Sequence, residues 1–333
     1  MMALHTAKPK HRVRVVARRW HSGPMRSSSI AAISLAITLI ANACGGPAGP
    51  SLNPVEPLTL PPASPAEQSS SMSSEEAATS DAPRTNTTSD IGDDAGAGPP
   101  SPQPLAQTAS VRTRLGHDRA AYTQGLLFHD GRLYESRGRY GKSALTEIDP
   151  TTGEVLRQAV VDPDYFAEGL ALVDNRLIQL TWQAGVALVY DLESFDLIGQ
   201  YTYSGEGWGL CYDGRDLWMS DGSSTLTRRD PVSFEATERI DVTLNGGPLD
   251  QLNELECFDG LVWANVWKTN QFVAIDPSTG DVVSVIDARG LLSRDERDAG
   301  AEVLNGIAYD RDRDVLVLTG KWWPAMFEVD LVP

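Results

Sequence analysis

The sequence predicts an all-β protein whose C-terminal part is a five-bladed β-propeller, preceded by an export segment and a disordered linker. Three observations carry this prediction. A tripeptide with a polar or aromatic first residue and an aliphatic third residue recurs along the chain. An acidic turn follows each copy, and a second acidic marker lies between copies. The copies begin at Gln124, Glu168, Trp208, Asn253 and Asn305.

The spacing of the copies fits one blade each. Their first residues are 44, 40, 45 and 52 positions apart, and a period of this length is typical of a four-stranded propeller blade. Asp-Gly or Asp-Asn follows the first four copies, as at Asp130 and Asp174, and these pairs tolerate the positive φ of tight hairpins. The second marker, expected in the outer part of each blade, occurs at Asp149, Asp191, Asp230 and Asp276.

Residues 1–43 have the features of an export signal. They contain seven Lys or Arg and no acidic residue, and 30–40 is an apolar run of eleven residues. A mature membrane-spanning helix needs about 20 residues, but the run suits the apolar region of a signal peptide. Because Met25 followed by Arg26 would give a signal of ordinary proportions, the true start is either Met1 or Met25.

Cys44 follows small residues, as the lipidated cysteine of a bacterial lipoprotein does. We predict that Cys44 is acylated and becomes the mature N-terminus, with ordinary secretion as the alternative. Residues 44–110 are rich in Pro, Ser and Ala and nearly lack aromatic residues, so they cannot bury enough apolar surface to offset the entropy of ordering. They are predicted to be a disordered tether that holds the domain at the extracytoplasmic face of the cell membrane.

Charge limits the partners. The formal net charge is −17, and loss of the seven positive charges in 1–43 makes it −24. Nucleic acid and anionic lipid headgroups are therefore poor partners, whereas the α-ammonium group of a peptide would be attracted. We expect a monomer that meets the membrane only through its lipid anchor.

The cysteines and histidines of the domain give no metal signature. Cys211 and Cys257 fall in the first strands of neighbouring copies, where an exported protein can hold either a disulfide or a buried pair of thiols. Only His117 and His129 occur after residue 110, and there is no C-x-x-C pattern. No catalytic metal or other cofactor is predicted, and a structural divalent cation is left open.

Residues 111–333 are expected to be all-β, because short strands alternate with Gly and Asp turns. The stretch 291–298 has few apolar positions and is predicted to be a surface loop. In a propeller the first strand of each blade lines the central channel. An antiparallel hairpin brings the start of that strand beside the end of the second. The repeat therefore gathers the five first residues with Trp182, Trp267 and Lys321 at one mouth of the channel.

At these residues the chain resembles the glutaminyl-peptide cyclotransferases of plant and bacterial type, over essentially all of 115–333. Ten ordered segments carry the resemblance, among them Tyr122-Thr-Gln-Gly-Leu126, Phe166-Ala-Glu-Gly-Leu170, Gly205-Glu-Gly-Trp-Gly-Leu210, Leu252-Asn-Glu-Leu-Glu256 and Thr319-Gly-Lys-Trp322. Tyr122 stands where the family usually has Phe, and Ala167 where it has Gly. The resemblance implies a five-bladed propeller that cyclises the N-terminal glutamine of peptides and proteins to pyroglutamate, with loss of ammonia and without a catalytic zinc.

The resemblance also implies roles for the clustered residues. The family's acid/base glutamate falls on Glu168, and its polar pocket residues fall on Gln124, Asn253 and Lys321. Its aromatic wall falls on Tyr122, Phe166, Trp182, Trp208 and Trp267. From the repeat we add Asn305 to the substrate-binding set.

These residue types suit the chemistry. The carboxylate of Glu168 can take a proton from the attacking amine and deliver one to the leaving nitrogen, and burial among aromatic rings should raise its pKa towards the working range. Lys321 or Asn253 can stabilise the oxyanion. Indole walls exclude water and fold the glutamine side chain back on its own amine.

Two other functions are compatible with such a pocket. Glu168, Asn253 and Asn305 at a channel mouth could coordinate a divalent cation, as in a lactonase-like propeller hydrolase. A propeller on a lipid tether could also bind a partner without any catalysis.

Overall fold

The computed structural model describes residues 103–333, and these form strands joined by short loops, with one short helix. They are therefore all-β, as predicted. In this range no helix is long and apolar enough to span a membrane. The predicted signal segment, Cys44 and all but the last residues of the predicted tether lie outside the described residues.

Three antiparallel sheets of four strands follow one another along the chain. Their strands are β2 (Thr123–His129), β3 (Arg132–Arg137), β4 (Ala144–Ile148) and β5 (Val155–Val160); β6 (Ala167–Val173), β7 (Arg176–Thr181), β8 (Val186–Asp191) and β9 (Leu197–Thr202); and β10 (Leu210–Tyr212), β11 (Leu217–Ser220), β12 (Thr225–Arg229) and β13 (Ala236–Asp241). Consecutive strands are neighbours throughout, so each sheet is a simple meander.

The remaining long strands form one eight-stranded sheet. Its strands are β16 (Leu252–Phe258), β17 (Leu261–Val266), β18 (Gln271–Ile275), β19 (Val282–Asp287), β20 (Leu304–Asp310), β21 (Val315–Gly320), β22 (Ala325–Val332) and β1 (Leu105–Gly116). β1 lies between β19, to which it runs parallel, and β22, to which it runs antiparallel. β1 therefore joins two antiparallel sets of strands, β16–β19 and β20–β22.

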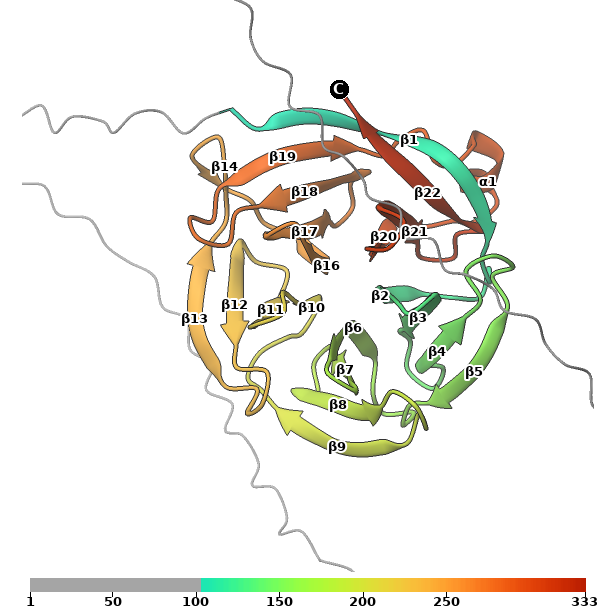
Figure 1. Cartoon of the computed structure of the whole chain (residues 1–333), viewed down its shortest axis with the longest axis vertical. Helices are drawn as coiled ribbons and strands as arrows, with labels where there is room; N and C mark the ends of the chain where they lie inside the picture. The colour runs from blue at the N-terminus through green and yellow to red at the C-terminus, as the bar shows by residue number, and fades with distance from the viewer. Residues whose placement is uncertain (1–102) are drawn as a thin grey trace, which may run out of the picture. The chain divides into compact units, whose positions relative to one another are not determined.

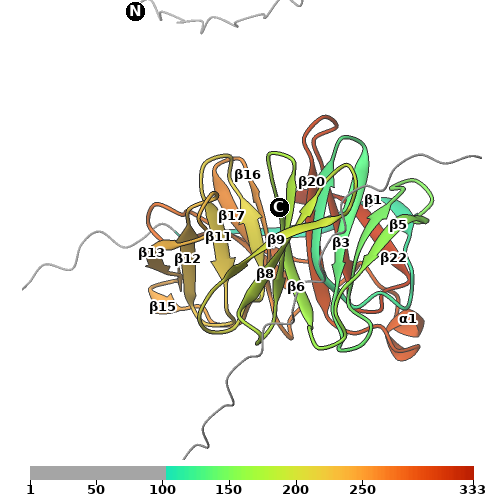
Figure 2. The same cartoon turned by 90° about the horizontal axis from the view of Figure 1, so that it is seen from below.

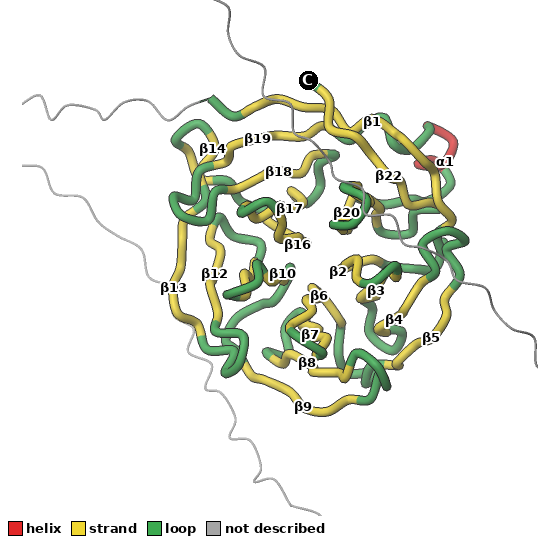
Figure 3. Tube along the Cα trace, viewed as in Figure 1, coloured by secondary structure: helices red, strands yellow, loops and turns green. Residues whose placement is uncertain are grey.

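The sheets of residues 103–333 are arranged around a common centre (Figure 1). β2, β6, β10, β16 and β20 lie innermost, and β5, β9, β13 and β1 lie outermost. Burial follows this order, because β6 is buried along nearly its whole length and β9 is mostly exposed. From the side, the sheets stand next to one another (Figure 2), and loops connect successive strands (Figure 3).

Neighbouring sheets are held together by apolar clusters between their faces. Leu127 and Tyr134 of the first sheet pack in one cluster with Leu170 and Leu177 of the second. A similar cluster joins β10–β12 to β16–β18. Removing apolar surface from water stabilises such contacts by about 25 cal/mol per Å², so each sheet depends on the next for its burial.

The second acidic marker lies at the turns between the third and fourth strands, as predicted for the outer part of each sheet. Asp149, Asp191, Asp230 and Asp276 each accept a hydrogen bond from the backbone N–H two residues later, at 2.8–3.1 Å. The last strand set lacks this marker because its outer neighbour is β1, which comes from the other end of the chain.

The structure differs from the sequence prediction at three places. Residues 105–110 belong to β1 rather than to a tether, because they pair with β19 and β22. The stretch 291–298 contains α1 (Arg294–Asp298) rather than only a loop, because Ser293 and Glu296 form a reciprocal capping box at its start. A small extra hairpin, β14 (Thr243–Leu244) and β15 (Gly247–Pro248), follows β13.

Cys211 of β10 and Cys257 of β16 form a disulfide in the structure. Both are buried within the apolar cluster between their sheets. Of the two states that the sequence left open, the bonded one is present. It ties together two innermost strands that are 46 residues apart in sequence.

Candidate active site

β-Bulges place the site residues at the start of the innermost strands. In β6, Ala167 pairs with Thr181 and Leu170 with Gln179, so one extra residue lies on the β6 side at Glu168. The same irregularity occurs in β2 at Gln124, in β16 at Asn253 and in β20 at Asn305. A bulge interrupts the ladder and re-aims a side chain, so the residue at this copy position leaves the regular alternation of the ladder in all four strands.

A cavity of about 240 Å³ lies where these strands begin. We call this cavity the pocket. It is lined by Tyr122, Gln124, Phe166, Glu168, Trp182, Trp208, Asn253, Trp267 and Lys321. These are nine of the ten substrate and catalytic residues predicted from the sequence. Trp182, Trp267 and Lys321 each directly follow a second strand, as the hairpin geometry requires.

Glu168 is the carboxylate of the pocket, and it is 5% exposed. Its Oε1 accepts a hydrogen bond of 2.7 Å from Nε2 of Gln124. Burial raises the pKa of Glu168 well above its usual range, although the positive charge of Lys321 opposes this rise and the charge of Glu206 adds to it. A carboxyl group with a raised pKa can both accept and release protons near neutral pH.

Lys321 supplies the ammonium group and is 4% exposed. Burial lowers the pKa of Lys321, while Glu168 and Glu302 act in the opposite direction. Its backbone N–H donates to the carbonyl of Val303 at 3.0 Å. Its Nζ lies 4.9 Å from the centre of the Tyr122 ring. The lysine is therefore held by its own strand end and by the aromatic wall.

Asn253 is 3% exposed, and its Oδ1 has no hydrogen-bond partner among the described residues. A buried amide without a partner costs about 1–3 kcal/mol. Because the side chain lines the pocket, a substrate group is well placed to satisfy it.

The aromatic residues form a wall of two parts, Tyr122, Phe166 and Trp182 in one and Trp208 and Trp267 in the other. Phe166 meets Tyr122 and Trp182 edge to face, with ring centres 6.2 and 5.8 Å apart. Trp208 and Trp267 make a second edge-to-face pair at 5.3 Å. Edge-to-face pairs each contribute roughly 0.5–1.5 kcal/mol beyond burial, so the wall has a fixed shape.

Asn305 is the one predicted site residue that does not line the pocket. It is fully buried, and its Nδ2 donates to Oε1 of Gln124 at 3.1 Å and to the carbonyl of Thr123 at 3.0 Å. The bulge of β20 turns it towards β2 and away from the cavity. Asn305 therefore fixes the amide of Gln124 with its Nε2 facing Glu168.

We expect Asn305→Ala to lower kcat by about tenfold, because loss of one hydrogen bond of about 1–1.5 kcal/mol leaves the Gln124 amide free to rotate. KM should change little, since Asn305 does not line the pocket. Steady-state kinetics on the purified variant, with its melting temperature as a control for folding, would measure this. An unchanged kcat would show that Gln124 does not depend on Asn305.

Comparison with known proteins agrees with this geometry. A profile described as glutamine cyclotransferase matches residues 85–331, well over half of the chain. The chain belongs to the glutamine cyclotransferase family. It is 41% identical over 227 residues to the glutaminyl-peptide cyclotransferase of Arabidopsis thaliana, and the match covers 66% of this chain and 70% of that protein. It is also similar to the crystal structure of glutaminyl cyclase from Myxococcus xanthus, with 37% identity and a TM-score of 0.65, covering 69% of this chain and 99% of that one.

Sequence reasoning missed two acidic residues near the centre of this glutamine cyclotransferase. Glu206 accepts hydrogen bonds from two indoles of the wall. Glu254 is buried beyond the pocket, where its carboxylate accepts the backbone N–H groups of Leu126 and Ile307 at 3.2 and 2.8 Å. Glu206 lies two residues before Trp208, and Glu254 directly follows Asn253. The repeat singles out Trp208 and Asn253 but assigns no role to either acid.

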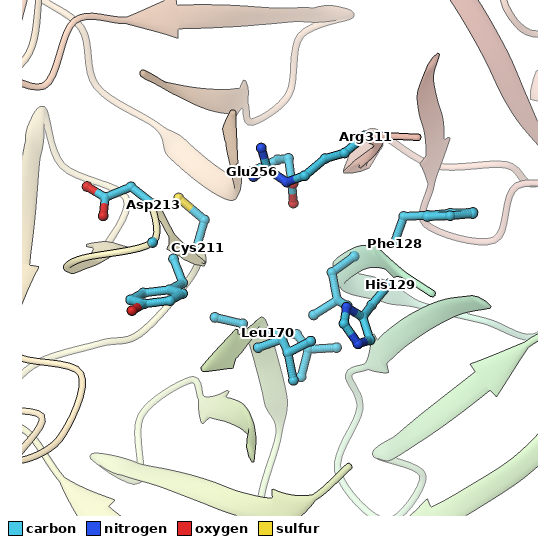
Figure 4. Close-up of a pocket in the computed structure, with 12 residues that line it drawn as sticks. Phe128, His129, Leu170, Cys211, Asp213, Glu256 and Arg311 are labelled. Atoms are coloured by element: carbon cyan, nitrogen blue, oxygen red, sulfur yellow. The ribbon is translucent and has the colours of Figure 1, made fainter. Parts of the chain in front are cut away.

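A second cavity, of about 380 Å³, lies at the other ends of the innermost strands (Figure 4). It lies where the innermost strands end, with His129 of β2 and Asp213 after β10 on its wall. Arg311 extends toward Glu256 there (Figure 4). Burial raises the pKa of Glu256 to about 8, against the positive charge of Arg311. Among residues 103–333, no group of three or more His, Cys, Asp or Glu is placed to hold a metal ion.

The raised pKa of Glu256 predicts that Glu256→Gln stabilises the protein, and that this stabilisation depends on pH. Between the ordinary pKa of 4.5 and the folded-state value of about 8, the unfolded chain has lost the proton that the folded chain keeps, so stability falls as the pH rises. Gln cannot titrate. We expect the melting temperature of the Glu256→Gln variant to exceed that of the parent protein by a few degrees at pH 8 and to equal it at pH 4. An equal difference at both pH values would contradict the assignment.

Proposed function

We propose that this protein is a glutaminyl-peptide cyclotransferase that converts the N-terminal glutamine of peptides and proteins to pyroglutamate and releases ammonia. The observation that carries the proposal is the buried carboxylate of Glu168, with its raised pKa, in an aromatic-walled pocket that also contains the ammonium group of Lys321. Membership of the glutamine cyclotransferase family supports the same reaction.

The reaction has three requirements that these residues can meet. The neutral α-amine attacks the γ-carboxamide carbon, and a new N–C bond closes the five-membered ring. The carbonyl oxygen gains negative charge. The bond to the amide nitrogen then breaks, and that nitrogen leaves as ammonia. One group must therefore move a proton from the attacking nitrogen to the leaving nitrogen, and another must stabilise the oxyanion.

Glu168 is the proposed proton carrier. As a carboxylate it accepts the proton of the attacking amine, and as a carboxylic acid it protonates the leaving nitrogen, so that it is regenerated at the end of each turnover. Its raised pKa brings both forms within reach near neutral pH. The hydrogen bond from Gln124 orients Oε1, which leaves Oε2 to face the substrate.

Lys321 and Asn253 are the proposed oxyanion donors. In other enzymes one such donor contributes roughly 3 kcal/mol to the transition state. The aromatic wall of Tyr122, Phe166, Trp182, Trp208 and Trp267 excludes water and presses the side chain of the substrate against its own amine. No metal or cofactor takes part in the proposed steps.

The fold proposed to carry this site is a five-bladed propeller. The three four-stranded sheets count as three blades. The eight-stranded sheet counts as two, β16–β19 and β20–β22, with β1 as the outer strand of the second. Five innermost strands around one centre then supply the five repeat positions of the sequence (Figure 1).

The proposed cellular location is outside the cytoplasm. Residues 1–43 are proposed to direct export, Cys44 to carry the lipid, and the following segment to hold a monomeric domain away from the membrane. This rests on the basic and apolar pattern of the N-terminus. Cys44→Ser should move the protein from the membrane fraction to the soluble fraction, as judged by immunoblotting. Retention in the membrane fraction would argue against lipidation.

A direct assay tests the activity. The purified protein is incubated with a Gln-led peptide, and mass spectrometry should show loss of one ammonia from the peptide together with free ammonia in solution. The same assay after exhaustive chelation tests the proposed independence from metal ions. A peptide led by acetylated glutamine is the matched control, because its α-nitrogen cannot attack. Absence of ammonia release from the free Gln-led peptide would overturn the proposal.

A further inference from the structure

One carboxylate joins the two parts of the aromatic wall. Oε2 of Glu206 accepts a hydrogen bond of 2.7 Å from Nε1 of Trp182 and one of 2.9 Å from Nε1 of Trp208. Its Oε1 accepts a third, of 2.9 Å, from Nε2 of Gln183. Trp182 belongs to the part of the wall that contains Phe166, and Trp208 pairs with Trp267. Glu206 is thus the polar link between the two parts.

The local backbone is built to bring Glu206 to this place. Gly205 has a φ of +86°, which favours glycine. A Cβ atom at Gly207 would lie 2.4 Å from the hydroxyl oxygen of Tyr203, so no larger residue fits without a shift. The N–H of Gly207 donates to the carbonyl of Trp182 at 2.9 Å. The loop before β10 is therefore tied to the end of β7, with Glu206 between the two indoles.

The negative charge of Glu206 reaches the pocket. Its three hydrogen bonds come from uncharged donors, so they hold the carboxylate without neutralising it. Burial raises the pKa of Glu206, but the bonds from Gln183, Trp208 and Trp182 together lower it below the usual range. The residue is therefore ionised at neutral pH. Its charge also contributes to the raised pKa of Glu168.

On the basis of the proposed function, we infer that Glu206 is a positioning and specificity-determining residue, which fixes the two indoles and disfavours N-terminal glutamate relative to glutamine. The two substrates share the α-amine, and any attraction of its ammonium form to Glu206 is the same for both. They differ only at the γ-group, which is an uncharged amide in glutamine and a carboxylate in glutamate. That carboxylate meets the like charge of Glu206, whose two indole partners line the pocket.

Two substitutions separate the charge from the hydrogen bonds. Glu206→Gln removes the charge, yet its amide oxygen can still accept both indole N–H groups, because both bond to one oxygen in the parent. Glu206→Ala removes the charge and the bonds. Glu193→Gln is the matched control, because it removes one negative charge at an exposed turn after β8.

The experiment uses a Glu-led peptide as a competitive inhibitor of the cyclisation of the corresponding Gln-led peptide. In Glu206→Gln we expect the inhibition constant to fall about tenfold. Glu193→Gln should match the parent. In Glu206→Ala, kcat should fall about tenfold or more and the tryptophan emission should shift, because the wall loses its link.

The pH profile gives an independent readout. The charged groups that act on Glu168 are Lys321 and Glu206. Loss of the Glu206 charge should lower the pKa of Glu168 and move the acid limb of kcat/KM to lower pH. A purely structural residue would not move that limb in a variant that folds normally.

The outcomes are distinguishable. If the parent protein releases no ammonia from the Gln-led peptide, the proposed function and this inference both fail. If the parent is active but Glu206→Gln leaves the inhibition constant and the acid limb unchanged, the inference alone is overturned. A kcat in Glu206→Ala equal to that in Glu206→Gln would overturn the positioning role.

Discussion

Replacing Glu168 by glutamine is expected to lower the rate of ammonia release from a Gln-led peptide by about 10²–10⁴-fold, the usual contribution of general acid/base catalysis. The amide keeps the size of the side chain and can still accept the hydrogen bond from Gln124. It cannot carry a proton from the attacking to the leaving nitrogen. Coupled detection of ammonia under single-turnover and steady-state conditions would measure the loss.

The same variant should fold normally. Because burial raises the pKa of Glu168, ionisation of this group opposes folding at neutral pH. An uncharged amide should therefore leave the melting temperature unchanged or raise it. Near-normal turnover in a well-folded Glu168→Gln protein would refute the role of Glu168 as the proton carrier.

Replacing Lys321 by methionine is expected to lower kcat by about 10²–10³-fold, as loss of one oxyanion donor does in other enzymes. Methionine keeps most of the apolar stem that packs near Tyr122 and removes only the donor and its charge. Separate determination of kcat and KM is essential, because an interaction made only in the transition state affects kcat.

Lys268→Met is the matched control for this variant. Lys268 is an exposed lysine one residue after Trp267, with its Nζ 4.1 Å from the centre of that ring. We expect its kcat to stay within about threefold of the parent. A rise in KM at constant kcat in Lys321→Met would instead assign the lysine to substrate binding.

The sequence located most of the pocket because the hairpin repeat fixes which strand ends meet. Glu168 begins one inner strand and Lys321 follows the second strand of another set, and both line one cavity. The repeat does not specify how far each bulge turns its side chain. Asn305 occupies the same copy position as Glu168, yet it faces Gln124 instead of the cavity. That difference depends on backbone detail that periodicity does not encode.

Local chemistry explains the other misses. The helix α1 is held by its capping box rather than by an apolar face, so a search for apolar periodicity passes over it. Residues 105–110 become a strand only through partners more than 170 positions away. Glu206 lies in a loop before β10, where the repeat marks no position. Its role depends on two indoles that only the fold brings together.

The place of β1 between β19 and β22 has a consequence for how the molecule is made. The final strand, β22, must be synthesised before β1 can find its antiparallel neighbour, and pairing over so long a separation is slow. Lys321 stands only a few residues before β22. A nascent chain therefore lacks a complete pocket until β21 and the lysine that follows it have been synthesised.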